Sequence, residues 1–384
     1  MFDKSETLFP IRKNYVYLAH SAIGPMYGPA ARAACDFVET HSEEGVLLRD
    51  RYGRALTTFR DRVATFFKVD VGDIAYVSNT AEGIGLIANG YPFEPGDQVI
   101  SYVHEFPSNH YPWALQSERG VELILLSDVD PIGNLPIGAP RGWSMEELEA
   151  KTTERTRVVA LSHVQFASGY AADLKQLGHF CLERGIDLVI DAAQSFGVLP
   201  IHPKEYGISA VVSSAWKWLL ASRGAGLLYL APEFRRKLRI TMAGDAAMNH
   251  HLDYLNHSLD PREDTRRFEY STLPWEHLAS IETVLEEVFL RYGIEAIATE
   301  VFRLQDQLLN ALDTDRIRPL AFAPAHRSGI LSVRIGTNAA RLVDQLQAER
   351  IVATTQAGYL RLAPHFYQTD EEIERVATVL RRLA

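Results

Sequence analysis

A lysine and an aspartate that each follow a short apolar run could carry amine chemistry. Asp191 ends the run that starts at Leu188, and Lys217 follows the next run, at 208–212. Short apolar runs bounded by glycine and proline predict buried strands, and open α/β sheets bind ligands at the carboxyl ends of their strands. Because tryptophans flank the lysine, we expect apolar surroundings that lower its pKa and make it a nucleophile toward an aldehyde. The alternative is a lysine that only extends from the sheet to water.

Gln194, together with Asp191 and Lys217, points to a particular aldehyde cofactor for the Schiff-base chemistry of the lysine. Pyridoxal 5'-phosphate (PLP) needs a lysine for its Schiff base, an acid beside its ring nitrogen, a hydrogen bond to its ring oxygen and an anion site for its phosphate. Asp191 is the candidate acid, because a carboxylate there keeps the ring nitrogen protonated. Gln194 follows it closely in the chain and is the candidate partner of the ring oxygen. The pattern therefore predicts a PLP site.

The order of these residues resembles a known family. The arrangement D-x-A-Q followed by S-x-x-K is formed by Asp191, Ala193, Gln194, Ser214 and Lys217. It resembles the class V aminotransferases and cysteine desulfurases of the fold type I PLP-dependent enzymes. The resemblance implies an α/β fold with a large domain, whose mainly parallel seven-stranded sheet lies between helices, and a smaller α+β C-terminal domain. It also implies that Lys217 and Asp191 are catalytic.

The length of the chain agrees with two domains. Its 384 residues are 47% hydrophobic, which is enough for a large core. We expect an N-terminal segment, 1–20, associated with the small domain, then a large PLP-binding domain at 21–255 and a small α+β domain at 256–384. Helical spacing is expected throughout 30–67, with Arg60 on a solvated face.

Two loops of the large domain are expected to hold the cofactor. The sequence NTAEG opens a helix after an apolar strand, so Thr80 and Ala81 would lie at a helix N-terminus that attracts the phosphate. An ordinary threonine cap is the alternative. The resemblance places Phe106 on the face of the ring, where desulfurases of the family usually carry a histidine. Phenylalanine can stack there, but it cannot move a proton.

The lysine-bearing segment and a later loop supply further expected contacts. The resemblance implies that Ser214 binds the phosphate and that Trp216 donates its indole N–H where many relatives carry a histidine. It also implies that Thr272 reaches the phosphate of a partner subunit, which would make the protein a homodimer. An exposed loop is the alternative for Thr272.

The substrate is expected at a separate group of residues. Arg361 in the sequence LRLAPHFY matches the family arginine that binds a substrate carboxylate, and its planar guanidinium fits an amino acid or oxo acid. An ordinary salt bridge is the alternative. His20 and Ala22 follow a short strand and match a family segment that touches the substrate, although a surface turn would look the same.

Charge, hydropathy and motifs disfavour several other classes. The net charge of −10 and pI near 5.7 argue against a nucleic-acid partner. No apolar run has the length of a membrane span, and the N-terminal residues lack the apolar stretch of a signal peptide, so we expect a cytoplasmic protein. The glycines do not match G-x-G-x-x-G, which disfavours a nucleotide-binding oxidoreductase.

The expected activity is that of a class V aminotransferase, in which Lys217 removes the α-proton of an amino acid. Epimerisation, as in relatives of isopenicillin N epimerase, and β-elimination by a lyase stay open. So does a PLP-binding protein without turnover. Cysteine desulfurase activity is disfavoured, because it needs a thiolate on a loop before the Arg361 strand and the only cysteines are Cys35 and Cys181.

Overall fold

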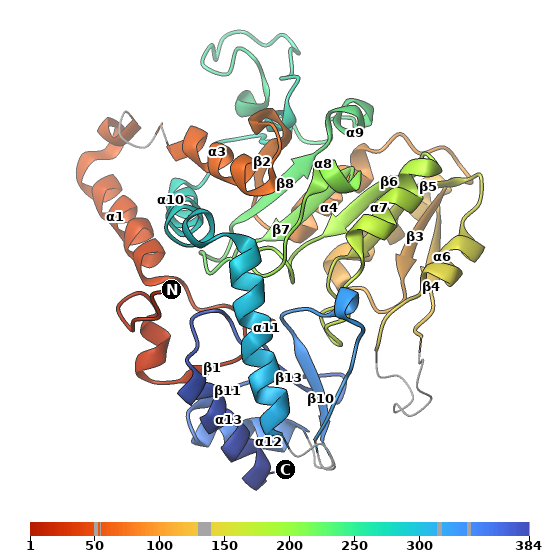
Figure 1. The fold of residues 1–384 in the computed structure, drawn as a ribbon. Helices are drawn as coiled ribbons and strands as arrows, with labels where there is room; N and C mark the ends of the chain where they lie inside the picture. The colour runs from red at the N-terminus through yellow and green to blue at the C-terminus, as the bar shows by residue number, and fades with distance from the viewer. Residues whose placement is uncertain (50–52, 54, 130–139, 313–316, 336–338, 384) are drawn as a thin grey trace.

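The protein is described here by a computed structural model that covers residues 1–49, 53, 55–129, 140–312, 317–335 and 339–383 (Figure 1). Its central sheet has the strand order β2-β8-β7-β6-β5-β3-β4. The strands are β2 (Ile74–Val77), β3 (Gln98–Tyr102), β4 (Glu122–Leu126), β5 (Thr156–Ser162), β6 (Asp187–Asp191), β7 (Ala210–Ser214) and β8 (Gly226–Leu230). Neighbours from β7 to β4 are parallel, and β8 is antiparallel to both β7 and β2. The expected α/β fold is confirmed.

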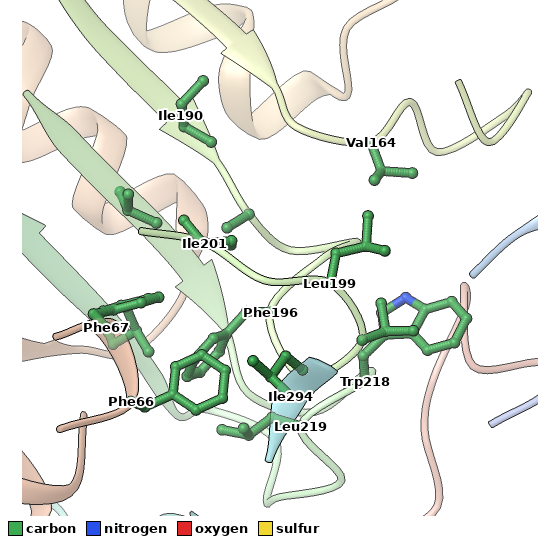
Figure 2. Packing of buried hydrophobic residues seen from close by; sticks show 14 of the residues in the cluster. Phe66, Phe67, Val164, Ile190, Phe196, Leu199, Ile201, Trp218, Leu219 and Ile294 are labelled. Atoms are coloured by element: carbon green, nitrogen blue, oxygen red, sulfur yellow. The ribbon is translucent and has the colours of Figure 1, made fainter. Parts of the chain in front are cut away.

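The strands form because their residues are apolar on both faces. Along β6, Leu188 and Ile190 belong to one hydrophobic core, whereas Val189 belongs to another on the opposite face. Successive side chains of a strand point to opposite faces, so a continuous apolar run is buried only when both faces are covered. Figure 2 shows part of the first core, where Phe66 and Phe67 pack near Phe196.

Helices cover these two faces (Figure 1). They are α1 (Gly28–Glu44), α3 (Ala55–Phe67), α4 (Thr80–Gly90), α5 (Tyr111–Ala114), α6 (Met145–Lys151), α7 (Leu174–Glu183), α8 (Pro203–Tyr206), α9 (Pro232–Lys237), α10 (Trp275–Val284) and α11 (Ile294–Ala311). The helical spacing expected over 30–67 corresponds to α1 and α3, and α1 ends before Gly45, whose φ of 55° is left-handed. Among the described helices, none is both long enough and apolar enough to cross a bilayer.

A second sheet lies toward the C-terminus. Its antiparallel order β12-β13-β10-β9 joins Thr354–Gln356, Tyr359–Leu362, Leu331–Ile335 and Ile317–Pro319. It packs with α12 (Ala339–Ala348) and α13 (Asp370–Leu383), and β1 (Val16–Tyr17) pairs in parallel with β11 (Ile351–Val352). The N-terminal strand therefore lies with the small sheet.

The hydrophobic cores divide within α11. Val301 packs with the core under the large sheet, whereas Leu304 and Leu308 pack with the small sheet. Helix α10 contacts α1 and α3, so it also packs on the large unit. The division at 255/256 stays a prediction, as do the two ranges 21–255 and 256–384.

Arg60 is buried, although its position in the helical pattern predicted a solvated face. Its side chain is buried and forms an ion pair with Glu269, which also accepts a hydrogen bond of 2.8 Å from the backbone N–H of Tyr76. A buried arginine requires such a partner. The pair attaches the segment before Thr272 to α3 and β2.

Candidate active site

A cavity of about 420 Å³ lies at the carboxyl ends of β5, β6 and β7. Nine of the twelve site residues expected from the sequence line it: Ala22, Thr80, Phe106, Asp191, Gln194, Ser214, Trp216, Lys217 and Arg361. Neighbouring strand ends of a parallel sheet converge at one edge. Residues that are far apart in the chain therefore meet in this cavity.

Lys217 and Asp191 both have pKa values shifted toward neutrality. Burial lowers the pKa of Lys217 to about 8, although the nearby Asp191 carboxylate acts in the opposite direction. Burial raises the pKa of Asp191 to about 6, although its Oδ1 accepts a hydrogen bond of 2.8 Å from the N–H of Ala193. Among the described residues, no cation lies within salt-bridge distance of Asp191. A buried carboxylate without a paired cation suits a protonated ring nitrogen.

The turn that carries Lys217 is held by the N-terminal segment. The backbone N–H of Gly24 donates to the carbonyl of Trp216 at 2.9 Å. A Cβ atom at Gly24 would lie 1.9 Å from the carbonyl oxygen of Lys217, so only glycine permits this approach. The contact brings Ser21 and Ala22 to the cavity.

The anion end of the cavity is built at the start of α4. Asn79 caps this helix, since its Oδ1 accepts from the N–H of Glu82 at 2.9 Å, and Thr80 is its first residue. The Oγ1 of Thr80 lies 3.0 Å from the Oγ of Ser214. Two hydroxyls at a helix N-terminus suit a phosphate. The side chain of Ala81 is exposed and does not line the cavity, and the phosphate contact expected of its backbone N–H stays a prediction.

Gln194 has a fixed orientation. Its Nε2 donates to the carbonyl of Ser21 at 2.8 Å, and its Oε1 accepts from the indole N–H of Trp218 at 3.0 Å. The amide nitrogen carries a second hydrogen. That hydrogen is available to an acceptor in the cavity.

An aromatic wall lies on one side of Lys217. The lysine Nζ lies 5.4 Å from the ring centroid of Phe106, and the rings of Phe106 and Phe166 meet edge to face with centroids 5.3 Å apart. Phe106 is 40% exposed, so its face is open to a flat ligand. Trp216 adds a further ring to the lining.

Arg361 lies on β13 at the opposite end of the cavity. It is buried, its Nη1 donates to the carbonyl of Phe166 at 2.5 Å, and its Nη2 donates to the hydroxyl of Thr354 at 3.2 Å. Its Nε has no hydrogen-bond partner, and no described carboxylate lies within salt-bridge distance. Burial lowers its pKa to about 10. A buried guanidinium without a counter-ion suits an anionic ligand.

His20 and Thr272 do not line the cavity of their own chain. His20 is fully buried, with Nδ1 at 2.7 Å from the carbonyl of Ala363 and Nε2 at 2.7 Å from the hydroxyl of Tyr367. Both ring nitrogens are therefore used inside the protein, and the substrate contact expected for the His20 segment stays a prediction. Thr272 is exposed, and its contact with a partner subunit stays a prediction.

Glu105 is a functional candidate that the sequence analysis missed. Its carboxylate is buried and accepts hydrogen bonds from the N–H of Ser162 at 2.7 Å, the hydroxyl of Ser162 at 2.5 Å and the Nε2 of Gln165 at 3.0 Å. Burial, with a smaller contribution from the Asp191 charge, raises its pKa to about 7, although the hydrogen bonds from Ser162 and Gln165 act in the opposite direction. Because Ser162 lines the cavity, Glu105 supports the wall next to Asp191.

The fold and the cavity define the class of the protein. The fold is that of the fold type I PLP-dependent enzymes: the structure of a C-DES mutant with glycine covalently linked to the PLP cofactor matches with a TM-score of 0.89 at 20% identity, over 99% of this chain and 100% of the other. Residues 37–376 match the family described as aminotransferase class-V. The chain belongs to this family, and the expected cofactor is confirmed at the level of the family, which uses PLP.

Relatives that match nearly the whole chain include proteins named as cysteine desulfurases and as aminotransferases. A probable cysteine desulfurase of Methanothermobacter thermautotrophicus is 24% identical over 98% of this chain and 96% of its own length. An uncharacterized aminotransferase of Bacillus subtilis, YcbU, is 22% identical over 97% of this chain and 95% of its own length. The apo cysteine desulfurase from Thermococcus onnurineus NA1 has a TM-score of 0.85 at 22% identity, over 97% of this chain and 96% of the other.

Proposed function

We propose that the protein is a PLP-dependent aminotransferase that acts on an α-amino acid. The observation that carries the proposal is the meeting of Lys217, Asp191 and Arg361 in one cavity. They are the only ionisable side chains among the described residues that line it. One amine, one carboxylate and one guanidinium match the needs of lysine chemistry, ring nitrogen and substrate carboxylate.

The residues present fit the cofactor. Thr80 and Ser214 would hold the phosphate, Asp191 the ring nitrogen and Gln194 the ring oxygen, while Phe106 would cover one face. The buried carboxylate of Asp191, with no described cation within salt-bridge distance, is the clearest sign of the fit, because a cationic ring nitrogen would compensate its charge. When bound, PLP supplies an aldehyde for the substrate amine and a ring that withdraws electrons from the α-carbon.

The chain itself supplies binding and proton transfer. Arg361 binds the substrate carboxylate and fixes the α-carbon relative to Lys217. With its pKa lowered to about 8, the Nζ of Lys217 is neutral often enough near neutral pH to take the α-proton. Phe106 and Trp216 cannot exchange protons at this pH. Asp191 would pair with the ring nitrogen, which leaves Lys217 as the base for the α-proton among the described lining residues. Transamination requires no further catalytic group.

β-Elimination from a sulfur-containing amino acid is the second candidate. It is favoured by relatives named probable cysteine desulfurase and by a structure described as the complex of "the cystine C-S lyase C-DES" with cysteine persulfide, with a TM-score of 0.87 at 20% identity, over 97% of this chain and 99% of the other. Expulsion of a β-sulfur group does not need a protein thiol. The exposed Cys35 and the buried Cys181, whose pKa burial raises to about 12, therefore do not argue against it. The relatives' names also keep cysteine desulfurase activity open.

Thr272 supports a dimer as part of the proposal. It is exposed on the segment that the Arg60–Glu269 pair attaches to the large unit. From there it would complete the phosphate site of a second copy. Gel filtration with light scattering tests the expected dimer, and a monomer that binds PLP fully would contradict it.

One experiment separates the reactions. The holoenzyme is incubated in heavy water with a panel of amino acids, including cysteine and cystine, and with oxo acids as acceptors. An aminotransferase gives an oxo acid and an α-deuterated amino acid, whereas a lyase or a desulfurase releases sulfide or persulfide. Inverted, deuterated substrate would indicate epimerisation. PLP binding without any α-exchange across the panel would overturn the proposal in favour of a protein that only binds the cofactor.

A further inference from the structure

Trp218 follows Lys217. It connects the part of the cavity formed by Asp191, Gln194 and Lys217, which we call the cofactor end, with the segments next to the small sheet. Its side chain is completely buried (Figure 2), and its carbonyl accepts a hydrogen bond from the Nε2 of His365 at 2.9 Å. A Cβ atom at Gly329 would lie 2.6 Å from the outer edge of its indole. The segment before β10 thus leaves room for this ring.

The indole nitrogen makes a single polar contact, with Gln194. The distance to Oε1 is 3.0 Å, and the Nε2 of the same amide lies 2.8 Å from the carbonyl of Ser21. An indole can only donate and a carbonyl can only accept. Both contacts therefore require the same orientation of the amide, with its oxygen toward Trp218 and its nitrogen toward Ser21 and the cavity.

We infer that Trp218 is a positioning residue, which fixes the Gln194 amide so that this side chain presents only an N–H group to the ring oxygen of the cofactor. The inference rests on the proposed binding of PLP. A donor beside that oxygen favours its ionised form, whereas an amide carbonyl beside it would disfavour that form. Without the indole N–H, only the bond from Nε2 to the Ser21 carbonyl opposes a turned amide that would present its oxygen.

The alternative is that Trp218 only fills the core. Trp218→Phe separates the two roles, since it keeps an aromatic ring and removes the N–H group. Trp113→Phe is the matched control: Trp113 is also buried, and its indole N–H donates to the Oδ1 of Asn109 at 3.1 Å, but Asn109 does not line the cavity. Each variant loses one bond from an indole to an amide oxygen.

The test uses the holoenzyme and two readouts that do not depend on turnover. These are the pH at which the visible absorption of the bound cofactor changes, and the dissociation constant of PLP. For Trp218→Phe we expect the midpoint to rise by about one pH unit and PLP affinity to fall roughly tenfold, as for one hydrogen bond to a charged group. Trp113→Phe should keep both wild-type values.

A double-mutant cycle shows whether the effect passes through the amide. In a Gln194→Leu background, adding Trp218→Phe should change neither readout further. Equal shifts with and without Gln194, or a Trp218→Phe protein with wild-type midpoint and affinity, would overturn the inference. If Trp218→Phe does not fold, replacement of Trp218 by 3-benzothienylalanine removes the N–H with the ring shape kept, and the same outcomes apply. Wild-type protein that binds no PLP would instead refute the proposed function.

Discussion

The two ends of the cavity differ in how completely their polar groups are satisfied. At the cofactor end, the side chains of Gln194, Thr80 and Ser214 are hydrogen-bonded inside the protein. At the substrate end, the buried Arg361 keeps its Nε without a partner. The hydroxyls and the amide of the cofactor end are held in place for one ligand, whereas the substrate end retains a guanidinium N–H whose hydrogen bond a carboxylate could accept.

The two ends also come from different parts of the fold. Asp191, Gln194, Ser214 and Lys217 follow strands of the large sheet, and Arg361 lies on β13 of the small sheet. Changes at the cofactor end should therefore alter cofactor binding and the chemical step. Changes at the substrate end should leave the cofactor in place and alter the affinity for substrate.

The largest effect is expected at Lys217. Lys217→Ala removes the only amine among the described lining residues, so covalent attachment of PLP should be lost and α-proton exchange should fall roughly 10³-fold. Peptide mapping by mass spectrometry after borohydride reduction measures the attachment. Lys175→Ala, at an exposed position on α7, is the control. An unchanged labelled peptide in Lys217→Ala would reject the lysine assignment.

A smaller loss is expected at Asp191. Asp191→Asn removes the charge beside the ring nitrogen but keeps the shape, so the protein should retain PLP while α-exchange falls roughly 10²-fold. The same change should lower the pKa of Lys217, because the carboxylate raises it. The pH profile of PLP capture by the apoprotein, followed by absorbance, should therefore move to lower pH. Wild-type exchange in this variant would contradict the assigned role.

Arg361 tests the substrate end. Arg361→Ala removes the buried cation, so KM for amino acids should rise roughly tenfold to a hundredfold, as for a lost hydrogen bond to a charged group. The PLP dissociation constant should stay at the wild-type value. Steady-state kinetics and a cofactor titration measure the two quantities, with the exposed Arg318→Ala on β9 as control. If Arg361→Ala weakened PLP binding as much as it raised KM, the two ends of the cavity would not have separate roles.

The smallest effect concerns the pH dependence of stability through Glu105. Its folded-state pKa of about 7 lies above the ordinary value of 4.5, so between these values the folded state holds more protons than the unfolded state. The contribution of Glu105 to stability is therefore present below pH 4.5 and is lost as the pH rises to about 7. Urea unfolding at several pH values should show the difference between wild type and Glu105→Gln declining over this range. If the difference in unfolding free energy instead rose with pH, the assigned direction of the Glu105 effect would be wrong. Glu146→Gln, at an exposed site, is the control.

The parts of the fold and site that depend on local sequence were predictable. The apolar runs that become β6 and β7 were expected from their residues, and Lys217 was expected after the second of them. Asn79 was missed as the cap of α4, because the expectation was placed on its neighbour Thr80. Thus an element is easier to predict than the residue at its boundary.

Contacts between distant residues were not predictable. Glu105 and Ser162 are 57 positions apart, and Trp218 and Gln194 are 24 apart. No residue adjacent to Glu105 or Trp218 indicates its partner, since the partner is chosen by the packing of separate strands and loops. His20 shows the same limit: a position near the site was expected for it, but its two partners on the 363–367 segment were not.

The close approach of Gly24 to Lys217 has a mechanical consequence. The same stretch of chain pairs with β11 of the C-terminal unit through Val16 and Tyr17 and contacts the backbone around Lys217 through Gly24. This short segment therefore connects the C-terminal unit with the turn of the large unit that carries Lys217. A rotation of the C-terminal unit that carries Arg361 would therefore displace the backbone at Lys217 through this segment, and a methyl group at position 24 would collide with the carbonyl of Lys217.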